Sequence, residues 1–297
     1  MKRYHLISIA IVFITIFMTN GCKIKSVNET PEVITVSILP QKFFIDQLTG
    51  GSVKVNVMLP PGAGHATYAP TAQQLQNMSQ SRLYVSMGHL GYEQTWLKRL
   101  TELSPNMAIL NLSDSLNLIN SSEKHNDHTH NDGIDPHIWM SPKVVAIFMP
   151  RLKAALLSNF PMLTDTIEKN YTLFMTKLNN LNQRTDTLVS LLPQKKFLIF
   201  HPALTYLARD YGLTQISIEE DGKEPSPAFL ADLIQKAKKE KIPVIFIQKE
   251  YDIRNAQLIG REANIQIEQI NPLAYNWLEE MERITGSLEK YLSASKN

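Results

Sequence analysis

Short runs of β-branched and aromatic residues alternate along the chain with longer runs in which apolar positions recur every three or four residues. The short runs predict β-strands, and the longer runs predict amphipathic helices. In the first half, the predicted strands are residues 33–39, 53–59, 83–87 and 107–112, and the predicted helices are 41–48, 70–80 and 92–103. This alternation is typical of a mostly parallel sheet that is covered by helices.

The same alternation returns in the second half of the chain. The predicted strands there are residues 196–200, 215–218, 244–248 and 266–270, and the predicted helices are 205–211, 227–240, 252–263 and 275–292. We therefore predict an α/β fold of two similar lobes, residues 32–160 and 193–297, each with a mostly parallel sheet flanked by helices.

One long helix is predicted to join the lobes, over residues 161–192, and a proline occupies its first position. Apolar residues recur along it at spacings of three and four except at Thr185, and Pro193 ends the pattern. Such a helix would extend roughly 45 Å. An ordinary core helix would show the same pattern, but its place between two sheets favours a rigid strut that limits hinge motion.

The first 21 residues have the pattern of a secretory signal peptide. A charged start, Lys2 and Arg3, precedes an apolar run that is too short for a typical membrane-spanning helix. Cys22 follows at once and is the only cysteine, so it cannot form an internal disulfide. Its placement resembles the lipid-modified cysteine of bacterial lipoproteins, although residues 19–21 depart from the usual lipobox. Residues 23–31 would then form a short polar tether behind the lipidated Cys22. A plain signal peptide cleaved nearby, or an uncleaved anchor, is the alternative.

Composition excludes one class of partner. The chain has 297 residues, enough for about two domains, and its 43% hydrophobic and 20% charged residues are ordinary for a globular protein. Without Lys2 and Arg3 the basic residues number 28, equal to the 28 acidic ones. A neutral mature chain argues against a nucleic-acid partner.

Candidate chemistry concentrates in residues 123–142, EKHNDHTHNDGIDPHIWMSP, which hold four of the eight histidines. His125, His128 and His130 lie among polar residues, so we predict a solvated loop over 123–132 that offers weak, auxiliary metal sites. His137 precedes Ile138 and two further apolar residues, so it lies where the chain returns to packed structure. Imidazole suits zinc, copper, nickel and iron. The alternative is a solvated loop beside a buried histidine.

Other histidines follow predicted strands, where ligands bind in open parallel sheets. His65 follows the second strand and His201 the fifth, so two facing lobes could bring them together with His137 in an interlobe cleft. Three neutral imidazoles can hold zinc and leave a fourth tetrahedral position open. His89 also follows a strand, and we interpret it as structural or supporting. Glu219 and Glu220 suit either supporting carboxylates or a solvated loop, and we favour the loop.

The stretches PPGAGHATYAP, DPHIWMSP, HPALTYLARDYGL and SIEEDGKEPSPAFLADLI resemble the metal-binding receptors of bacterial ABC importers for zinc or manganese. GYEQTWLKRL and INPLAYNWLEEME match more loosely, and the resemblance covers residues 33–292. It implies two α/β lobes joined by one long helix. It also implies that the metal ligands are His65, His137 and His201.

The sequence departs from this family at two positions. Asn271 stands where members usually carry an acidic residue, which can be the fourth ligand, so the fourth position falls to Asn271, to water or to a histidine of the loop. Gly64 precedes His65 where Pro or Glu is common. Manganese-type members generally replace the third histidine with a carboxylate. This chain keeps His201, and a nitrogen-rich site favours zinc over the harder manganese.

The leading hypothesis is therefore a monomeric, lipid-anchored extracytoplasmic receptor that binds Zn²⁺ and delivers it to an ABC permease and its ATPase. A manganese or iron receptor of the same family is one alternative. A zinc-dependent hydrolase with an open three-histidine site is another, but the chain has no HExxH motif and no nucleophile elbow, so we predict that it is not an enzyme. An adhesin is the third, and no feature of the sequence supports it directly.

Overall fold

The computed structural model describes residues 33–293 apart from 61, 65–67, 121–132 and 220–222. The predictions made for the signal peptide, for Cys22, for His65 and for the histidines of the loop fall outside these described residues.

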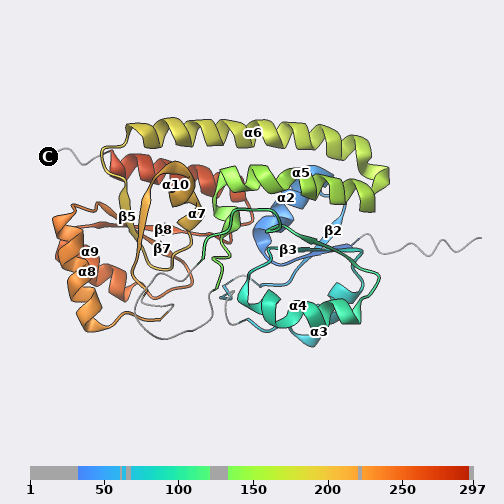
Figure 1. Ribbon diagram of the computed structural model, residues 1–297, viewed down its shortest axis with the longest axis horizontal. Coiled ribbons are helices and arrows are strands. Elements are labelled where there is room, and N and C mark those ends of the chain that lie inside the picture. The colour runs from blue at the N-terminus through green and yellow to red at the C-terminus, as the bar shows by residue number, and fades with distance from the viewer. Residues whose placement is uncertain (1–32, 61, 65–67, 121–132, 220–222, 294–297) are drawn as a thin grey trace, which may run out of the picture. The chain divides into compact units, whose positions relative to one another are not determined.

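The first lobe is a four-stranded parallel sheet with helices between its strands (Figure 1). Its elements are β1 (Val33–Val36), α2 (Leu39–Thr49), β2 (Lys54–Val57), α3 (Ala72–Ser79), β3 (Leu83–Ser86), α4 (Gly91–Leu103) and β4 (Ala108–Asn111). The strand order β2-β1-β3-β4 means that the chain turns to one side of β1 for the second strand and to the other side for the third.

The second lobe repeats this plan with the strand order β6-β5-β7-β8, again parallel throughout. Its elements are β5 (Lys196–Ile199), α7 (Thr205–Tyr211), β6 (Thr214–Ser217), α8 (Pro227–Lys239), β7 (Val244–Gln248), α9 (Arg254–Ala263), β8 (Gln266–Ile270) and α10 (Trp277–Leu292). The predicted fold of two similar α/β lobes is confirmed.

The predicted long helix is also confirmed, with a short 3₁₀ turn at Pro161–Leu163 before α6 (Thr164–Leu191). In Figure 1, α6 runs along both lobes, and it packs on α2 of the first lobe and on α10 of the second. The polar gap in its apolar face has a partner: the Thr185 hydroxyl lies 3.3 Å from that of Thr285 on α10, and both hydroxyls also bond to their own helix. Thr185 is thus a buried polar contact between the two helices.

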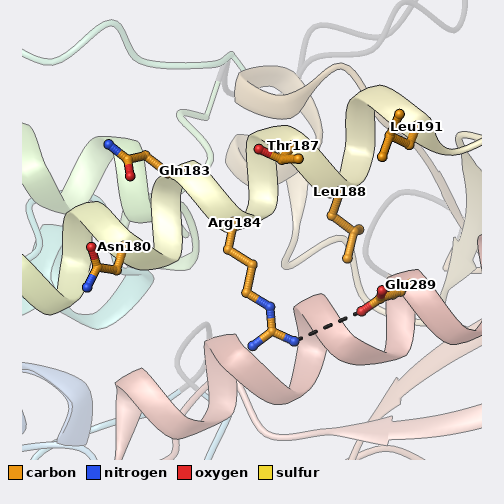
Figure 2. Close-up of a pocket in the computed structure, with 7 residues that line it drawn as sticks. All are labelled: Asn180, Gln183, Arg184, Thr187, Leu188, Leu191 and Glu289. Atoms are coloured by element: carbon orange, nitrogen blue, oxygen red, sulfur yellow. Dashed lines mark ion pairs between the residues drawn. The ribbon is translucent and has the colours of Figure 1, made fainter.

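An open surface groove lies between α6 and α10 (Figure 2). Arg184 and Glu289 face each other across it at 4.0 Å, and both side chains are more than half exposed. Leu191, at the end of α6, is also exposed. An exposed ion pair of this kind contributes little to stability, about 0–1 kcal/mol. The groove is the surface between two packed helices.

Among the elements of the described residues, one helix was not predicted: α5 (Pro142–Asn159), which follows a 3₁₀ turn at Ile138–Met140. Two prolines obscured its pattern, one at the start and Pro150 within it. Proline is tolerated at the first helical position, and the Ser141 side chain caps the start by accepting a hydrogen bond from the Val144 N–H. Pro150 lies on the exposed side of the helix.

The core extends continuously through both lobes. A single cluster of buried apolar side chains includes residues of β1, α2, α5, α6, β5, β7 and α10. Residues of β5 and the residue after it alternate between two clusters: Phe197 and Ile199 lie in this cluster, and Leu198 and Phe200 lie in a second cluster under α8 and α9. Both faces of the second sheet are therefore covered, as is usual for parallel sheets. Within the described residues, no helix is long and apolar enough to cross a membrane.

Candidate metal centre

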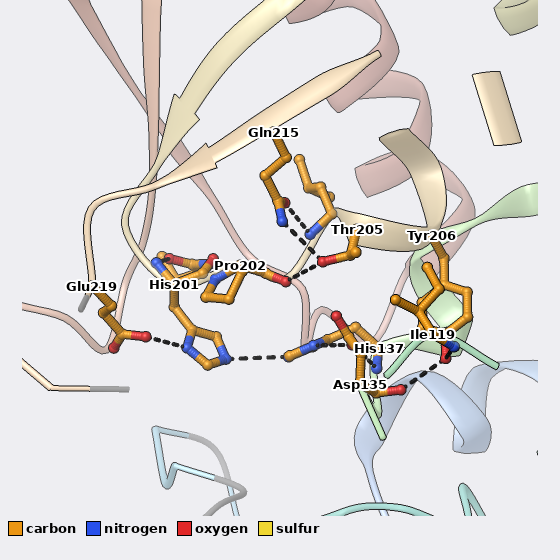
Figure 3. A network of polar contacts seen from close by, with 11 residues as sticks. Ile119, Asp135, His137, His201, Pro202, Thr205, Tyr206, Gln215 and Glu219 are labelled. Atoms are coloured by element: carbon orange, nitrogen blue, oxygen red, sulfur yellow. Dashed lines mark hydrogen bonds and ion pairs between the residues drawn. The ribbon is translucent and has the colours of Figure 1, made fainter. Parts of the chain in front are cut away.

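His201 lies just beyond the carboxyl end of β5, between the ends of its two neighbours β6 and β7. In a sheet of this order, the crevice beside the first strand is where ligands bind, because the chain leaves that strand toward one side and returns on the other. The Nδ1 of His201 lies 2.7 Å from Oε2 of Glu219, which follows β6 (Figure 3). The Glu219 side chain is only 8% exposed.

His137 is held by a comparable carboxylate. Asp135 accepts hydrogen bonds at Oδ1 from the backbone N–H of His137 and pairs with its Nδ1, both at 2.8 Å. The backbone carbonyl of Asp135 accepts a hydrogen bond from the Tyr206 hydroxyl at 2.9 Å, and that hydroxyl accepts one from the Ile119 N–H at 3.1 Å (Figure 3). His137 is buried, with 3% of its surface exposed.

The two imidazoles face each other through their other nitrogens. Nε2 of His137 and Nε2 of His201 are 3.3 Å apart, and the ring planes cross at 69° (Figure 3). Two nitrogens bound to one tetrahedral zinc ion at ~2.0–2.1 Å would be separated by about 3.3–3.4 Å. The pair thus already has the spacing that a shared zinc ion requires.

The carboxylates determine which nitrogen is presented to a ligand. When a neutral imidazole donates Nδ1–H to a carboxylate, its Nε2 carries a lone pair. If His137 and His201 both donate from Nδ1, a hydrogen bond between their Nε2 atoms requires one of the two rings to carry a second proton. The ring that donates from Nε2 is then a cation. A metal cation between the rings satisfies both lone pairs, and carboxylate–histidine–metal arrangements of this type are common in zinc proteins.

The charge of Asp135 is stabilised where it lies. Burial alone would raise the pKa of this carboxyl, but the electrostatic interaction with His137 and the hydrogen bonds from its ring and backbone together hold the pKa below its usual range. Asp135 therefore remains ionised beside His137. A buried negative charge at this point increases the attraction of the site for a cation.

Of the three predicted ligands, the structure brings His137 and His201 together, while His65 lies outside the described residues. Within the described ranges, no group of three or more His, Cys, Asp or Glu side chains is arranged to hold a metal. The described part of the chain thus contains a two-histidine pair and not the complete set that we predict.

The other sequence-predicted residues have varied surroundings. Asn271 follows β8. Its side-chain oxygen accepts a hydrogen bond from the backbone N–H of Leu273 at 3.2 Å, and its backbone N–H donates to the Glu280 carboxylate at 2.7 Å. His89 follows β3 in the first lobe, where burial lowers its pKa although Asp114 opposes this. His125, His128, His130 and Glu220 lie outside the described residues.

The interpretation of Glu219 as part of a solvated loop was wrong. Its carboxylate is nearly buried because it pairs with His201. Sequence reasoning also missed Asp135 and the stacking of Tyr251 on the His201 ring, with centroids 5.3 Å apart. The signal for the carboxylates was present, since each is close in sequence to a strand end or to a candidate ligand. Which carboxylate meets which histidine depends on the strand order, which the sequence pattern does not contain.

The two-lobed fold is that of the ZnuA crystal structure, which superposes with a TM-score of 0.80 at 33% identity, and the sequence comparison gives the family. The family model described as zinc-uptake complex component A, periplasmic (ZnuA), matches residues 34–294. The chain belongs to the ZnuA family.

Individual relatives agree with this assignment. The zinc-binding lipoprotein AdcA of Streptococcus pneumoniae (strain ATCC BAA-255 / R6) is 28% identical over 280 residues, which cover 89% of this chain and 55% of AdcA. The chain thus spans about half the length of AdcA. The high-affinity zinc uptake system protein ZnuA of Bacillus subtilis (strain 168) is 25% identical, with 86% of this chain and 83% of that protein covered. A zinc-bound crystal structure of a ZnuA deletion mutant superposes with a TM-score of 0.80 at 33% identity, covering 89% of this chain and 99% of that one.

Proposed function

We propose that this protein is an extracytoplasmic zinc receptor that delivers the ion to an ABC importer. The observation that carries the proposal is the His137–His201 pair, whose Nε2 atoms are 3.3 Å apart while each Nδ1 is held by a carboxylate. Zinc is the cargo here, so the site must bind it tightly and also release it. The names of the ZnuA and AdcA relatives support zinc as the ion.

The proposed ligands are His65, His137 and His201. His137 and His201 supply two imidazole nitrogens, and His65, in the loop after β2, supplies the third. The fourth tetrahedral position goes to Asn271, to water or to a histidine of the 123–132 loop. The side-chain oxygen of Asn271 already accepts the Leu273 N–H, but an amide oxygen has a second lone pair.

The surroundings of the pair favour binding over catalysis. A zinc hydrolase needs a general base beside the metal-bound water. Among the described residues, the carboxylates that contact the pair are Asp135 and Glu219, and both are engaged at Nδ1 of a histidine, where they orient the rings. The nitrogen-rich ligand set likewise favours zinc over manganese.

The remaining parts of the proposal concern location and partners. Lipidation of Cys22 would anchor a monomeric receptor to the membrane, and residues 23–31 would serve as a tether. The name of AdcA as a lipoprotein supports such an anchor. The partners are the membrane permease of the importer and its ATPase.

A zinc titration of the mature domain, residues 23–297, tests the proposal. The wild type should bind one zinc ion tightly, and His65→Ala, His137→Ala and His201→Ala should each weaken binding by orders of magnitude, because two histidines cannot close a tetrahedral site. His89→Ala is the matched control and should bind as the wild type does. If two of the three ligand variants keep wild-type affinity, the assignment is wrong. Loss of ester hydrolysis on adding a chelator would instead favour an enzyme.

A further inference from the structure

The last residue of β7 and the turn that follows this strand each contact His201. β7 ends at Gln248, and the chain then folds back, since the N–H of Tyr251 donates to the carbonyl of Gln248 at 3.3 Å. Gln248 is 1% exposed, so its amide group is buried. A buried amide destabilises the fold unless both its oxygen and its nitrogen find hydrogen-bond partners.

Both partners are on the backbone of His201. The amide oxygen of Gln248 accepts the His201 N–H at 3.3 Å, and the amide nitrogen donates to the His201 carbonyl at 2.7 Å. The ladder between β5 and β7 ends one residue earlier, where the Phe200 N–H donates to the carbonyl of Phe246. The Gln248 side chain therefore continues the hydrogen-bond ladder by one residue, from Phe200 to His201, the residue that carries the imidazole.

The imidazole ring is also restrained. Tyr251 stacks on one face of it, with ring centroids 5.3 Å apart and planes 19° apart, and Tyr251 itself packs against Phe200 at 5.1 Å. Glu219, which follows β6 on the other side of β5, pairs with Nδ1 of His201. His201 is thus held at its backbone, at its ring face and at one ring nitrogen by groups from both strands beside β5.

We propose that Gln248 and Tyr251 are positioning residues that hold the Nε2 of His201 at the distance from His137 that zinc requires. This inference rests on the proposed function. The physical reason is preorganisation: a ligand whose backbone and ring are fixed during folding has no further conformational entropy to lose when the metal binds. Neither residue contacts the metal, and both act through His201.

The test compares zinc dissociation constants of matched variants. Gln248→Leu keeps the size of the side chain and removes both hydrogen bonds, and Tyr251→Leu removes the stacked ring. Each should weaken zinc binding about 10–100-fold, the usual effect of losing a group that orients a metal ligand. Tyr251→Phe keeps the ring and should bind within about twofold of the wild type, since by this inference the ring rather than the hydroxyl acts.

Gln194 supplies the control, because it plays the same part at the opposite end of β5. Its amide oxygen accepts the N–H groups of Lys195 and Lys196 at 2.9 and 3.0 Å, and its nitrogen donates to the carbonyl of Glu240 at 2.9 Å. Gln194→Leu should lower the melting temperature but leave the zinc affinity unchanged. The visible spectrum of the cobalt-substituted protein at saturating metal gives a second readout, and it should change in Gln248→Leu and not in Gln194→Leu.

The outcomes separate this inference from the function on which it rests. If the wild type binds no zinc, the proposed function fails. If the wild type binds zinc but Gln248→Leu and Tyr251→Leu bind it equally well, or if Gln194→Leu loses as much affinity as Gln248→Leu, the positioning role is overturned. Should Gln248→Leu not fold, Gln248→Glu replaces it. That variant retains the acceptor for the His201 N–H and loses the donor to its carbonyl, so the inference requires weaker zinc binding than in the wild type.

Discussion

The indole N–H of Trp277 donates a hydrogen bond to the backbone carbonyl of Trp139 at 2.7 Å, and the indole N–H of Trp139 donates to the carbonyl of Pro272 at 2.8 Å. Trp139 lies two residues after His137, whereas Pro272 and Trp277 belong to the second lobe. The Tyr206 hydroxyl adds a third bond, to the carbonyl of Asp135. The residues on both sides of His137 are therefore hydrogen-bonded to the second lobe, which also carries His201.

The first prediction concerns this attachment. Trp139→Phe keeps an aromatic ring but leaves the buried carbonyl of Pro272 without its donor, which should lower the free energy of unfolding by about 1–3 kcal/mol. Urea denaturation measures the loss. Trp96 on α4, which is partly buried against the core and lies beside Arg99, is the matched control. Trp96→Phe should lower the free energy of unfolding by less than Trp139→Phe does, because it does not remove the donor of a buried carbonyl. Equal urea midpoints for Trp139→Phe and the wild type would contradict the prediction.

The second prediction concerns the carboxylates. Asp135→Asn and Glu219→Gln retain a hydrogen-bond acceptor but remove the charge that makes each imidazole a better ligand, so zinc binding should weaken about 10–100-fold in each. Competition against a zinc chelator of known affinity gives the constants. Asp186→Asn removes an exposed carboxylate that pairs with Lys143 and should have no effect on affinity. A wild-type constant in both carboxylate variants would show that neither group supports its histidine.

The lobes could be predicted from the sequence because apolar periodicity reports local structure. The strands, most helices and the strand-end position of His201 all followed from it. The helix α5 was not predicted; it contains two prolines, of which Pro142 starts the helix and Pro150 lies on its exposed side. The partner of Thr185 and the contact between Glu219 and His201 could not follow from periodicity either. Both join segments that are brought together only by helix packing or by the order of strands in the sheet.

The third prediction concerns the fourth ligand. Asn271→Asp keeps an oxygen that can accept the Leu273 N–H, so the turn after β8 should persist. A carboxylate at this position would attract zinc by several kcal/mol at a separation near 4 Å, so affinity should rise at least about tenfold. Isothermal titration in competition with a chelator measures the change. An unchanged constant would remove position 271 from the surroundings of the metal.

The fourth prediction concerns attachment to the membrane. In the full-length protein, Cys22→Ser should release the protein into a soluble fraction or leave its signal peptide unprocessed, because two acyl chains anchor a protein stably where a single chain binds only marginally. Fractionation and mass spectrometry of the mature N-terminus are the measurements. A wild type that is wholly soluble and carries an unmodified thiol would rule lipidation out.

The last prediction concerns His125, His128 and His130, which we expect to lie outside the tight site. Their segment has no apolar residue to order it, so closing it on a metal would cost about 1–2 kcal/mol for each residue fixed. His137 and His201 have met this cost during folding, as their carboxylate contacts show. Deleting residues 123–131 should therefore leave the tight zinc constant nearly unchanged and remove additional weak zinc equivalents.

The same titration can also contradict this prediction. If the deletion abolishes tight binding while circular dichroism shows an intact fold, a histidine of the loop supplies the fourth ligand. A variant with His125, His128 and His130 all replaced by Asn is the control for loop length, because it keeps the segment and removes only the imidazoles. Loss of affinity in both variants would assign the fourth position to the loop. Loss in the deletion alone would show that shortening the chain had displaced His137, the first ligand after the loop.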